Sequence, residues 1–226
     1  MLILIEIPSS LYSRFLSKKK DFQIPFDINN IIGIGKNFSE TKNIKLVQSF
    51  KKNPDFFVMA RNSLISSNKK INLPNCYGSV LIEGEVGVVI KKKCKNLSPK
   101  QVKNYILGYV ICNDLSGRDL KSLHNDNVLL RKSSDNFLPI GPAIKIGHQK
   151  SNFEIKTFIN GKLIQVSNSS QLIISIDNII SLLSKYITLN KFDLICTGSG
   201  LPKPKARKND NVKITINNLG ELNSRI

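Results

Sequence analysis

Alternating apolar and polar positions predict a chain built mainly from β-strands. Residues 81–90 form a nearly continuous apolar run, the strongest strand pattern in the sequence. Residues 153–159 alternate and lead into Asn160-Gly161, a pair favoured in two-residue hairpin turns. The same reasoning predicts further short strands at residues 31–34, 56–59, 109–112, 162–165, 192–197 and 212–216.

Fewer segments show helical spacing. Ser98-Pro-Lys-Gln101 is typical of a capping box with proline at the first helical position, and apolar residues recur from Val102 to Tyr109. Residues 171–186 place apolar side chains on one stripe, and residues 41–53 are expected to form a basic helix. No repeat or linker divides the chain, so we expect one β-rich α+β body with a few helices.

The charge of the chain invites a nucleic-acid interpretation, because 226 residues carry a formal net charge of +18. However, 28 lysines outnumber 6 arginines and are spread along the sequence, whereas phosphate and guanine recognition favours arginine. We attribute the bias to AT-rich codons and expect no nucleic-acid partner. A basic surface can still steer small anions inward.

Membrane insertion and zinc-knuckle or thioredoxin chemistry are not supported. No apolar run approaches the ~18 residues that cross a bilayer, so we expect no membrane partner. The four cysteines show no CxxC spacing, and reduced thiols are typical of the cytoplasm. We therefore expect a cytoplasmic protein, with an organelle matrix as the alternative.

Two carboxylates in the strongest strand are the first candidates for chemistry. Glu83 and Glu85 are two residues apart, so their side chains would leave a strand on the same face. Two buried carboxylates repel each other and need a cation or a proton, and a divalent ion with oxygen ligands is the economical answer. The alternative is a strand end whose two acids face water.

Further polar residues follow the predicted strand at residues 109–112. Asp114 lies where this strand leaves the core, a place that often carries catalytic groups on a rigid support. Arg118 and Asp119 could pair with each other or with a substrate carboxylate. An ordinary Asx-turn with a surface ion pair is the alternative.

In their order along the chain, these segments resemble the fumarylacetoacetate hydrolase family from about residue 31 to the C-terminus. The matching segments are residues 35–38, 83–85, 108–109, 113–119, 132–142, 160–165 and 197–199. The resemblance implies a mixed β-roll of the family's C-terminal type with a few peripheral helices. It also implies a catalytic domain over residues 31–226, an N-terminal extension over residues 1–30 packed on that domain, and a homodimer.

The resemblance also implies a set of site residues. The implied ligands of Mg²⁺ or Mn²⁺ are Glu83, Glu85 and Asp114. The implied catalytic residues are Lys132, Arg118 and Ser199. The implied substrate-binding residues are Lys132, Gln165, Ser199 and Asn37.

Family substrates are small anionic 2-oxo or 1,3-diketo carboxylic acids whose oxygens chelate the metal. A hard cation would polarise the carbonyl and stabilise an enolate. C–C bond hydrolysis of an acylpyruvate-like acid is the family's default reaction. Isomerisation, tautomerisation or decarboxylation through the same enolate is one alternative, and a degenerate paralogue with a binding or structural role is another.

Several positions depart from the family pattern. Many small hydrolytic members carry a His-x-x-Glu lid dyad that activates water, and this sequence has Thr41 and Ile44 there. Neither side chain can act as a general base near neutral pH. Met59 replaces a usual lysine, and Glu40 is a candidate substitute base or a surface glutamate. We therefore expect reactions that need only the enolate to be retained, and hydrolysis, which also needs an activated water, to be slow.

Overall fold

A computed structural model describes residues 28–38, 44–119, 126–147 and 152–226. Its main element is a seven-stranded mixed sheet in which β1 pairs with β12 and β3 with β9 in parallel, and the other neighbours are antiparallel. In spatial order its strands are β2 (Asp55–Met59), β1 (Ile31–Gly35), β12 (Leu194–Cys196), β6 (Gly84–Ile90), β7 (Ile106–Asn113), β9 (Leu138–Ile146) and β3 (Leu64–Ser66).

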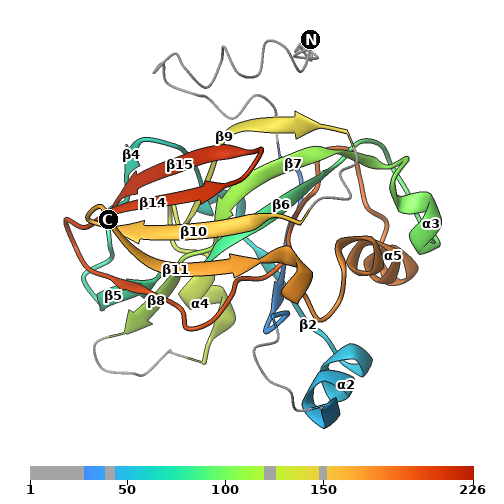
Figure 1. The fold of residues 1–226 in the computed structure, drawn as a ribbon, viewed down its shortest axis with the longest axis horizontal. Coiled ribbons are helices and arrows are strands. Elements are labelled where there is room, and N and C mark those ends of the chain that lie inside the picture. Colours follow the sequence, from blue (N-terminus) through green and yellow to red (C-terminus); the bar gives the residue numbers. More distant parts are fainter. Residues whose placement is uncertain (1–27, 39–43, 120–125, 148–151) are drawn as a thin grey trace.

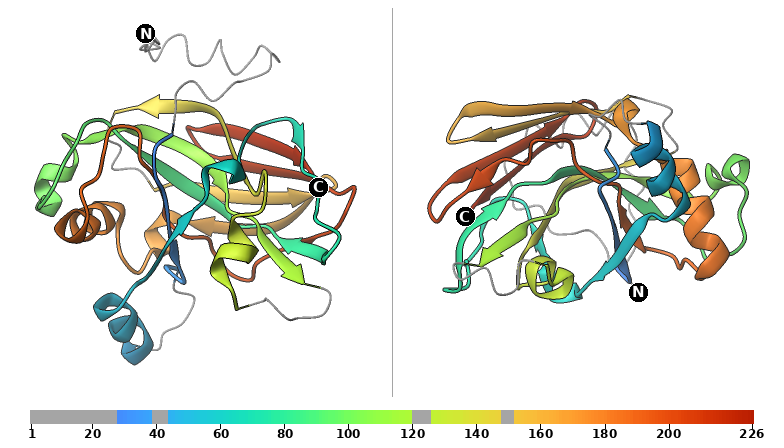
Figure 2. Two further views of the ribbon diagram at one scale, coloured as in Figure 1. Left: turned by 180° about the vertical axis from the view of Figure 1, so that it is seen from behind. Right: turned by 90° about the horizontal axis from the view of Figure 1, so that it is seen from below.

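A five-stranded sheet packs on one face of this main sheet, and the two layers are visible in Figure 1 and in the view from below in Figure 2. Its strands, in spatial order, are β11 (Lys162–Asn168), β10 (Glu154–Ile159), β14 (Asn211–Ile216), β15 (Gly220–Arg225) and β4 (Lys69–Lys70). A three-stranded sheet completes the body with β13 (Lys205–Ala206), β5 (Tyr77–Leu81) and β8 (Ser116–Asp119).

The helices lie at the periphery (Figure 1). They are α2 (Ile44–Lys52), α3 (Pro99–Val102), α4 (Val128–Lys132) and α5 (Ile176–Tyr186), with short 3-10 turns η1 (Arg61–Ser63) and η2 (Ser169–Gln171). No helix in the described part of the chain is long and apolar enough to cross a membrane. A strand-rich body with few helices is the architecture that the sequence predicts.

The core explains why β6 has an apolar run rather than an alternating pattern. Every residue of β6 is buried, because each face of the strand meets a different apolar cluster. Val88 belongs to the cluster shared with the five-stranded sheet, and its neighbour Val89 belongs to a cluster on the opposite face. Gly84 lets the layers approach closely, since a Cβ there would lie 3.1 Å from Ile214 and 3.3 Å from Ile155.

Three predicted elements are wrong in their extent. The helix predicted over residues 171–186 begins only at Ile176. The helix predicted from Ser98 begins as expected, with Gln101 Oε1 accepting from Ser98 N at 2.8 Å, but α3 ends at Val102. The following residues are rich in β-branched and aromatic side chains, which favour strands, and they form β7 against β6. The strand predicted at residues 81–90 is divided between β5 and β6, and Glu83 lies at the break.

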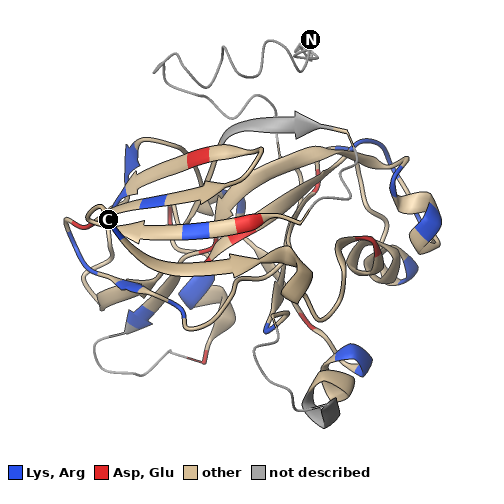
Figure 3. Cartoon of the chain, in the orientation of Figure 1, with Lys and Arg blue, Asp and Glu red and all other residues tan. Residues whose placement is uncertain are grey.

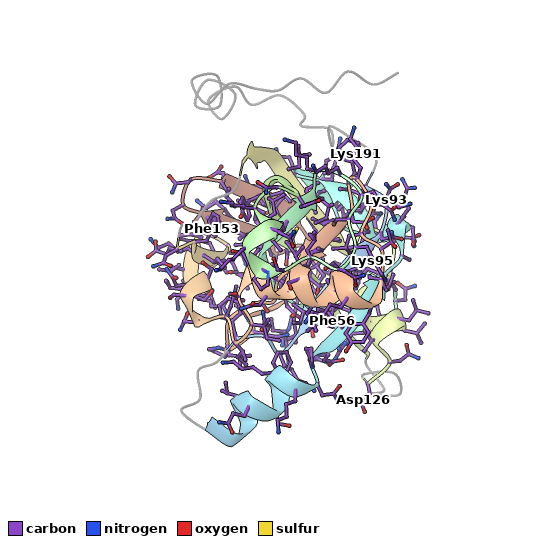
Figure 4. The ribbon with its side chains drawn as sticks, turned by 90° about the vertical axis from the view of Figure 1, so that its right-hand side faces the viewer. Phe56, Lys93, Lys95, Asp126, Phe153 and Lys191 are labelled. Carbon is purple, nitrogen blue, oxygen red and sulfur yellow. The ribbon has the colours of Figure 1, made fainter. Side chains whose placement is uncertain are left out.

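Lysine and arginine residues are dispersed over the described elements. Figure 3 shows lysine and arginine on the outer strands and on the helices rather than in one cluster. Figure 4 shows Lys93, Lys95 and Lys191 on the end of the molecule that carries α5. This dispersion agrees with the spread of lysines along the sequence.

Candidate metal and substrate site

Three buried carboxylates converge where β6 and β7 run side by side. Glu85 lies in β6, Glu83 precedes that strand directly, and Asp114 follows the last residue of β7. The antiparallel register pairs Gly84 with Asn113, which brings the flanking acids together. One oxygen from each carboxylate lies within 4.8 Å of the other two, and the three residues are only 2–3% exposed.

Lys132 is the buried cation of this cluster. It is the last residue of α4 and is 3% exposed. Its Nζ donates to Glu83 Oε1 at 3.0 Å and to Asp114 Oδ2 at 2.7 Å. The same ammonium lies 5.6 Å from the centroid of the Phe57 ring. We call Glu83, Glu85, Asp114 and Lys132 the floor of the site.

Other groups fix the orientation of the floor carboxylates. Ser116 Oγ donates to Glu83 Oε1 at 2.5 Å, and the backbone N–H of Gly198 donates to Glu85 Oε2 at 2.8 Å. Glu83 Oε2 accepts from Ser199 Oγ at 3.3 Å and forms an ion pair with Lys203 Nζ. We call Ser199 and Lys203, which come from the loop between β12 and β13, the rim of the site.

The floor carboxylates differ in their affinity for protons. Burial raises the pKa of Glu83, but attraction to Lys132 and Lys203 outweighs it and lowers the value to about 2. Burial, followed by repulsion from Asp114, raises the pKa of Glu85 well above its usual range. Burial also raises the pKa of Asp114 to about 6, against the attraction of Lys132.

Lys132 stays charged in this surrounding. Burial alone would lower its pKa, but Asp114 and Glu83 raise that pKa above its ordinary value. Lys132 and Lys203 together offset two of the three acids, so the cluster needs a further cation or a proton on Glu85.

The donor set fits a hard divalent cation. All three candidate ligands are carboxylates, which suit Mg²⁺ or Mn²⁺. Asp114 Oδ1 is buried and has no hydrogen-bond partner among the described residues, and a buried polar atom of this kind calls for a ligand. These residues could hold the ion that the family resemblance implies.

The other predicted site residues lie in different situations. Asn37 is fully buried, and its Nδ2 donates to the carbonyl oxygens of Ile174 and Thr197 at 3.0 Å each. Gln165 donates through Nε2 to Gly200 O at 2.9 Å and to Pro202 O at 2.7 Å. The side-chain amide nitrogens of Asn37 and Gln165 thus both donate to backbone carbonyl oxygens. Gln165 holds the rim loop, and Asn37 holds the base of that loop.

Arg118 lies on β8, two residues from Ser116, and is half-buried. Within the described residues it forms no ion pair with the three carboxylates. Met59, which replaces the family's usual lysine, is 2% exposed and packs in the apolar cluster behind β6. The uncharged side chain suits this apolar surrounding. Residues 1–27, Glu40 and Thr41 lie outside the described residues, as do the two histidines of the chain, His124 and His148. Ile44 begins α2.

Sequence reasoning missed Lys203 and the role of Ser116. Ser116 belongs to the segment 113–119 that drew attention to Asp114, so its neighbourhood was a usable signal. Lys203 stands in Pro202-Lys203-Pro204, 120 residues from Glu83. Nothing local in the sequence indicates that contact.

Comparison with known proteins shows the family to which this chain is similar. Residues 30–226 match the family model described as fumarylacetoacetate (FAA) hydrolase C-terminal. The fumarylacetoacetate hydrolase domain-containing protein 2 homolog of Dictyostelium discoideum is 35% identical over 218 residues, which cover 88% of this chain and 71% of that protein.

Solved structures show the same architecture. The 2-hydroxyhepta-2,4-diene-1,7-dioate isomerase from Mycobacterium marinum superposes with a TM-score of 0.77 at 30% identity, covering 89% of this chain and 75% of its own. A fumarylpyruvate hydrolase from Pseudomonas aeruginosa, solved with Mn²⁺ and pyruvate, has a TM-score of 0.77 at 23% identity. The match covers 88% of this chain and 90% of the hydrolase chain. The fold class predicted from the sequence is confirmed.

Proposed function

Because the chain belongs to the fumarylacetoacetate hydrolase family, we propose that it is a divalent-metal-dependent enzyme that acts on a small 2-oxo or 1,3-diketo carboxylic acid through an enolate. The observation that carries this proposal is the floor itself, where three buried carboxylates share one space and Asp114 Oδ1 has no partner among the described residues. The ion would be Mg²⁺ or Mn²⁺, held by Glu83, Glu85 and Asp114. When bound, it would supply a Lewis acid for the carbonyl and the developing enolate.

The chain's own residues would prepare this chemistry. Lys132 holds Glu83 and Asp114 side by side and places a buried positive charge near the position of an anionic substrate. Ser116 fixes one oxygen of Glu83. Ser199 makes only a long 3.3 Å contact with the other, so its hydroxyl is free to turn and donate to a substrate oxygen.

Several reactions could generate this enolate. C–C bond hydrolysis is the default that the family resemblance implies. Isomerisation or decarboxylation is favoured by Thr41 and Ile44, because neither supplies the base that would activate water. A relative of 30% identity, the Mycobacterium marinum protein, is named an isomerase. The homodimer, the absence of nucleic-acid and membrane partners, and the cytoplasmic location remain predictions.

Metal binding tests the floor. Wild-type protein should bind one Mn²⁺ per chain, and Asp114→Asn should weaken binding by more than the roughly 10- to 100-fold that outer partners of a metal contribute. Calorimetric titration measures both, and Asp126→Asn, at an exposed acid labelled in Figure 4, is the matched control. Equal affinity in wild type and Asp114→Asn would remove Asp114 from the ligand set.

A substrate panel tests the reaction. Oxaloacetate enol–keto exchange and decarboxylation, acylpyruvate cleavage and isomerisation of dienoic 2-oxo acids should be measured in one Mn²⁺-loaded preparation. Hydrolysis should be the slow activity, and Thr41→His combined with Ile44→Glu should raise it selectively by up to ~10²–10⁴-fold. Rapid wild-type hydrolysis that survives Glu40→Gln and His124→Ala would show that another group activates water.

A further inference from the structure

Lys203 is a second cation on the same carboxylate that Lys132 holds. Lys132 contacts Glu83 Oε1, and Lys203 contacts Glu83 Oε2. Their burial differs, because the side chain of Lys132 is 4% exposed and that of Lys203 is 26% exposed. Lys203 therefore stands at the opening of the site, between the buried acids and solvent.

The backbone that carries Lys203 is held on both sides. Before it, Gln165 Nε2 binds the carbonyl oxygens of Gly200 and Pro202. After it, Ile82 N donates to Pro204 O at 2.8 Å, and β13 pairs with β5. Proline on each side restricts the backbone further, so the backbone at Lys203 is constrained, whereas these contacts leave its four-carbon side chain free to turn.

The partner of Lys203 is a carboxylate that a divalent ion would also attract. Positive charge placed among Glu83, Glu85 and Asp114 repels the Lys203 ammonium and competes for Glu83. The ammonium then becomes available to another anion. A substrate whose first carboxylate chelates at the floor would present its far end toward the rim, where Lys203 stands.

We infer that Lys203 is a specificity-determining residue that binds a second, non-chelating carboxylate of the substrate. Gln165 acts as a positioning residue for it, because its amide holds the two carbonyl groups that precede Lys203. The inference rests on the proposed function and narrows its substrates to dicarboxylic 2-oxo acids.

A matched pair of ligands tests this assignment. 2-Oxobutanoate and 2-oxopentanedioate share the chelating end, and only the second has a distal carboxylate. In Mn²⁺-loaded protein, Lys203→Met should weaken 2-oxopentanedioate binding by about five- to tenfold, as expected for a partly exposed charge-assisted hydrogen bond. Binding of 2-oxobutanoate should change less than twofold. Lys205→Met removes the same charge from an exposed position two residues away and should leave the ratio of the two affinities unchanged.

Two further measurements separate a direct role from a structural one. Titration of Mn²⁺ into ligand-free protein should show affinity raised by up to about fivefold in Lys203→Met, since a competing cation is gone. Gln165→Leu should lower the ratio of the two oxo-acid affinities, and adding Lys203→Met in that background should lower it little further. A general loss of folded protein would not change this ratio.

The possible failures are distinguishable. Equal losses for both oxo acids in Lys203→Met would place Lys203 on the chelating carboxylate and overturn the inference alone. No change for either ligand would also overturn it. Wild-type protein that binds Mn²⁺ but neither oxo acid, or no Mn²⁺ at all, would overturn the proposed function together with the inference.

Discussion

The floor and the rim of the site carry similar groups but hold them in different ways. The floor acids are attached to β6 and β7, and the register between these central strands sets their separation. The rim lies on a loop that depends on two distant amides, Asn37 at its base and Gln165 along its length. Charges on the floor are thus part of the folded core, whereas charges on the rim can change with little effect on the fold.

The largest expected effect comes from breaking the floor ion pairs. Lys132→Met leaves Asp114 buried without a cation and Glu83 with Lys203 alone, which should lower the unfolding free energy of metal-free protein by about 3–5 kcal/mol. Lys203→Met should cost less than about 1 kcal/mol, because Glu83 keeps Lys132 and the lost pair is partly solvated. Urea unfolding in the presence of a chelator compares the two, with Lys205→Met as a surface control. Equal losses would abolish the distinction between floor and rim.

Two serines on opposite oxygens of Glu83 sharpen the comparison. Ser116 is 1% exposed and donates at 2.5 Å, so Ser116→Ala should cost about 1.5–3 kcal/mol, as for hydrogen bonds to charged groups. Ser199→Ala should cost less, because its contact is 3.3 Å long. The same unfolding experiment measures both. A larger loss from Ser199→Ala would contradict the assignment of Ser199 to an adjustable rim.

The third effect is the pH dependence of metal affinity. Asp114 and Glu85 must lose protons before they can bind a cation, and their pKa values are raised by burial, that of Asp114 to about 6. Protons therefore compete below those values, and Mn²⁺ affinity should rise with pH by up to about tenfold per unit for each proton released.

Titration from pH 5 to 8 in weak buffer measures affinity and proton release together. Lys203→Met should retain the upward slope, since the acids that titrate belong to the floor. Glu154→Gln, at an exposed acid paired with Lys156, serves as the control. Affinity independent of pH would mean that Glu85 and Asp114 are already ionised in the metal-free protein.

The three floor acids could be located from sequence because their signals are local, whereas Lys132 was indicated only by the family resemblance. The two-residue spacing of Glu83 and Glu85 and the position of Asp114 after an apolar segment both follow from short-range patterns. The register between β6 and β7, which brings these acids together, cannot be predicted from the residues of either strand alone. Family resemblance supplied that connection before the structure did.

The rim could not be predicted in the same way. Lys203 meets Glu83 only because β13 pairs with β5 and thereby places the preceding loop over the start of β6. The helix predicted beyond Val102 failed for a related reason, since pairing with β6 outweighed a helical spacing of apolar residues. In both cases a contact distant in sequence decided the local structure.

The two lysines on Glu83 also bear on how the enzyme matures. With a proton on Glu85, the charges of Glu83 and Asp114 are balanced by Lys132 and Lys203. A neutral cluster can be buried without an ion, so the newly made chain can finish folding before it meets a metal. If the floor holds the proposed divalent ion, the supply of ions around the finished protein, rather than the folding reaction, would then decide which ion is bound.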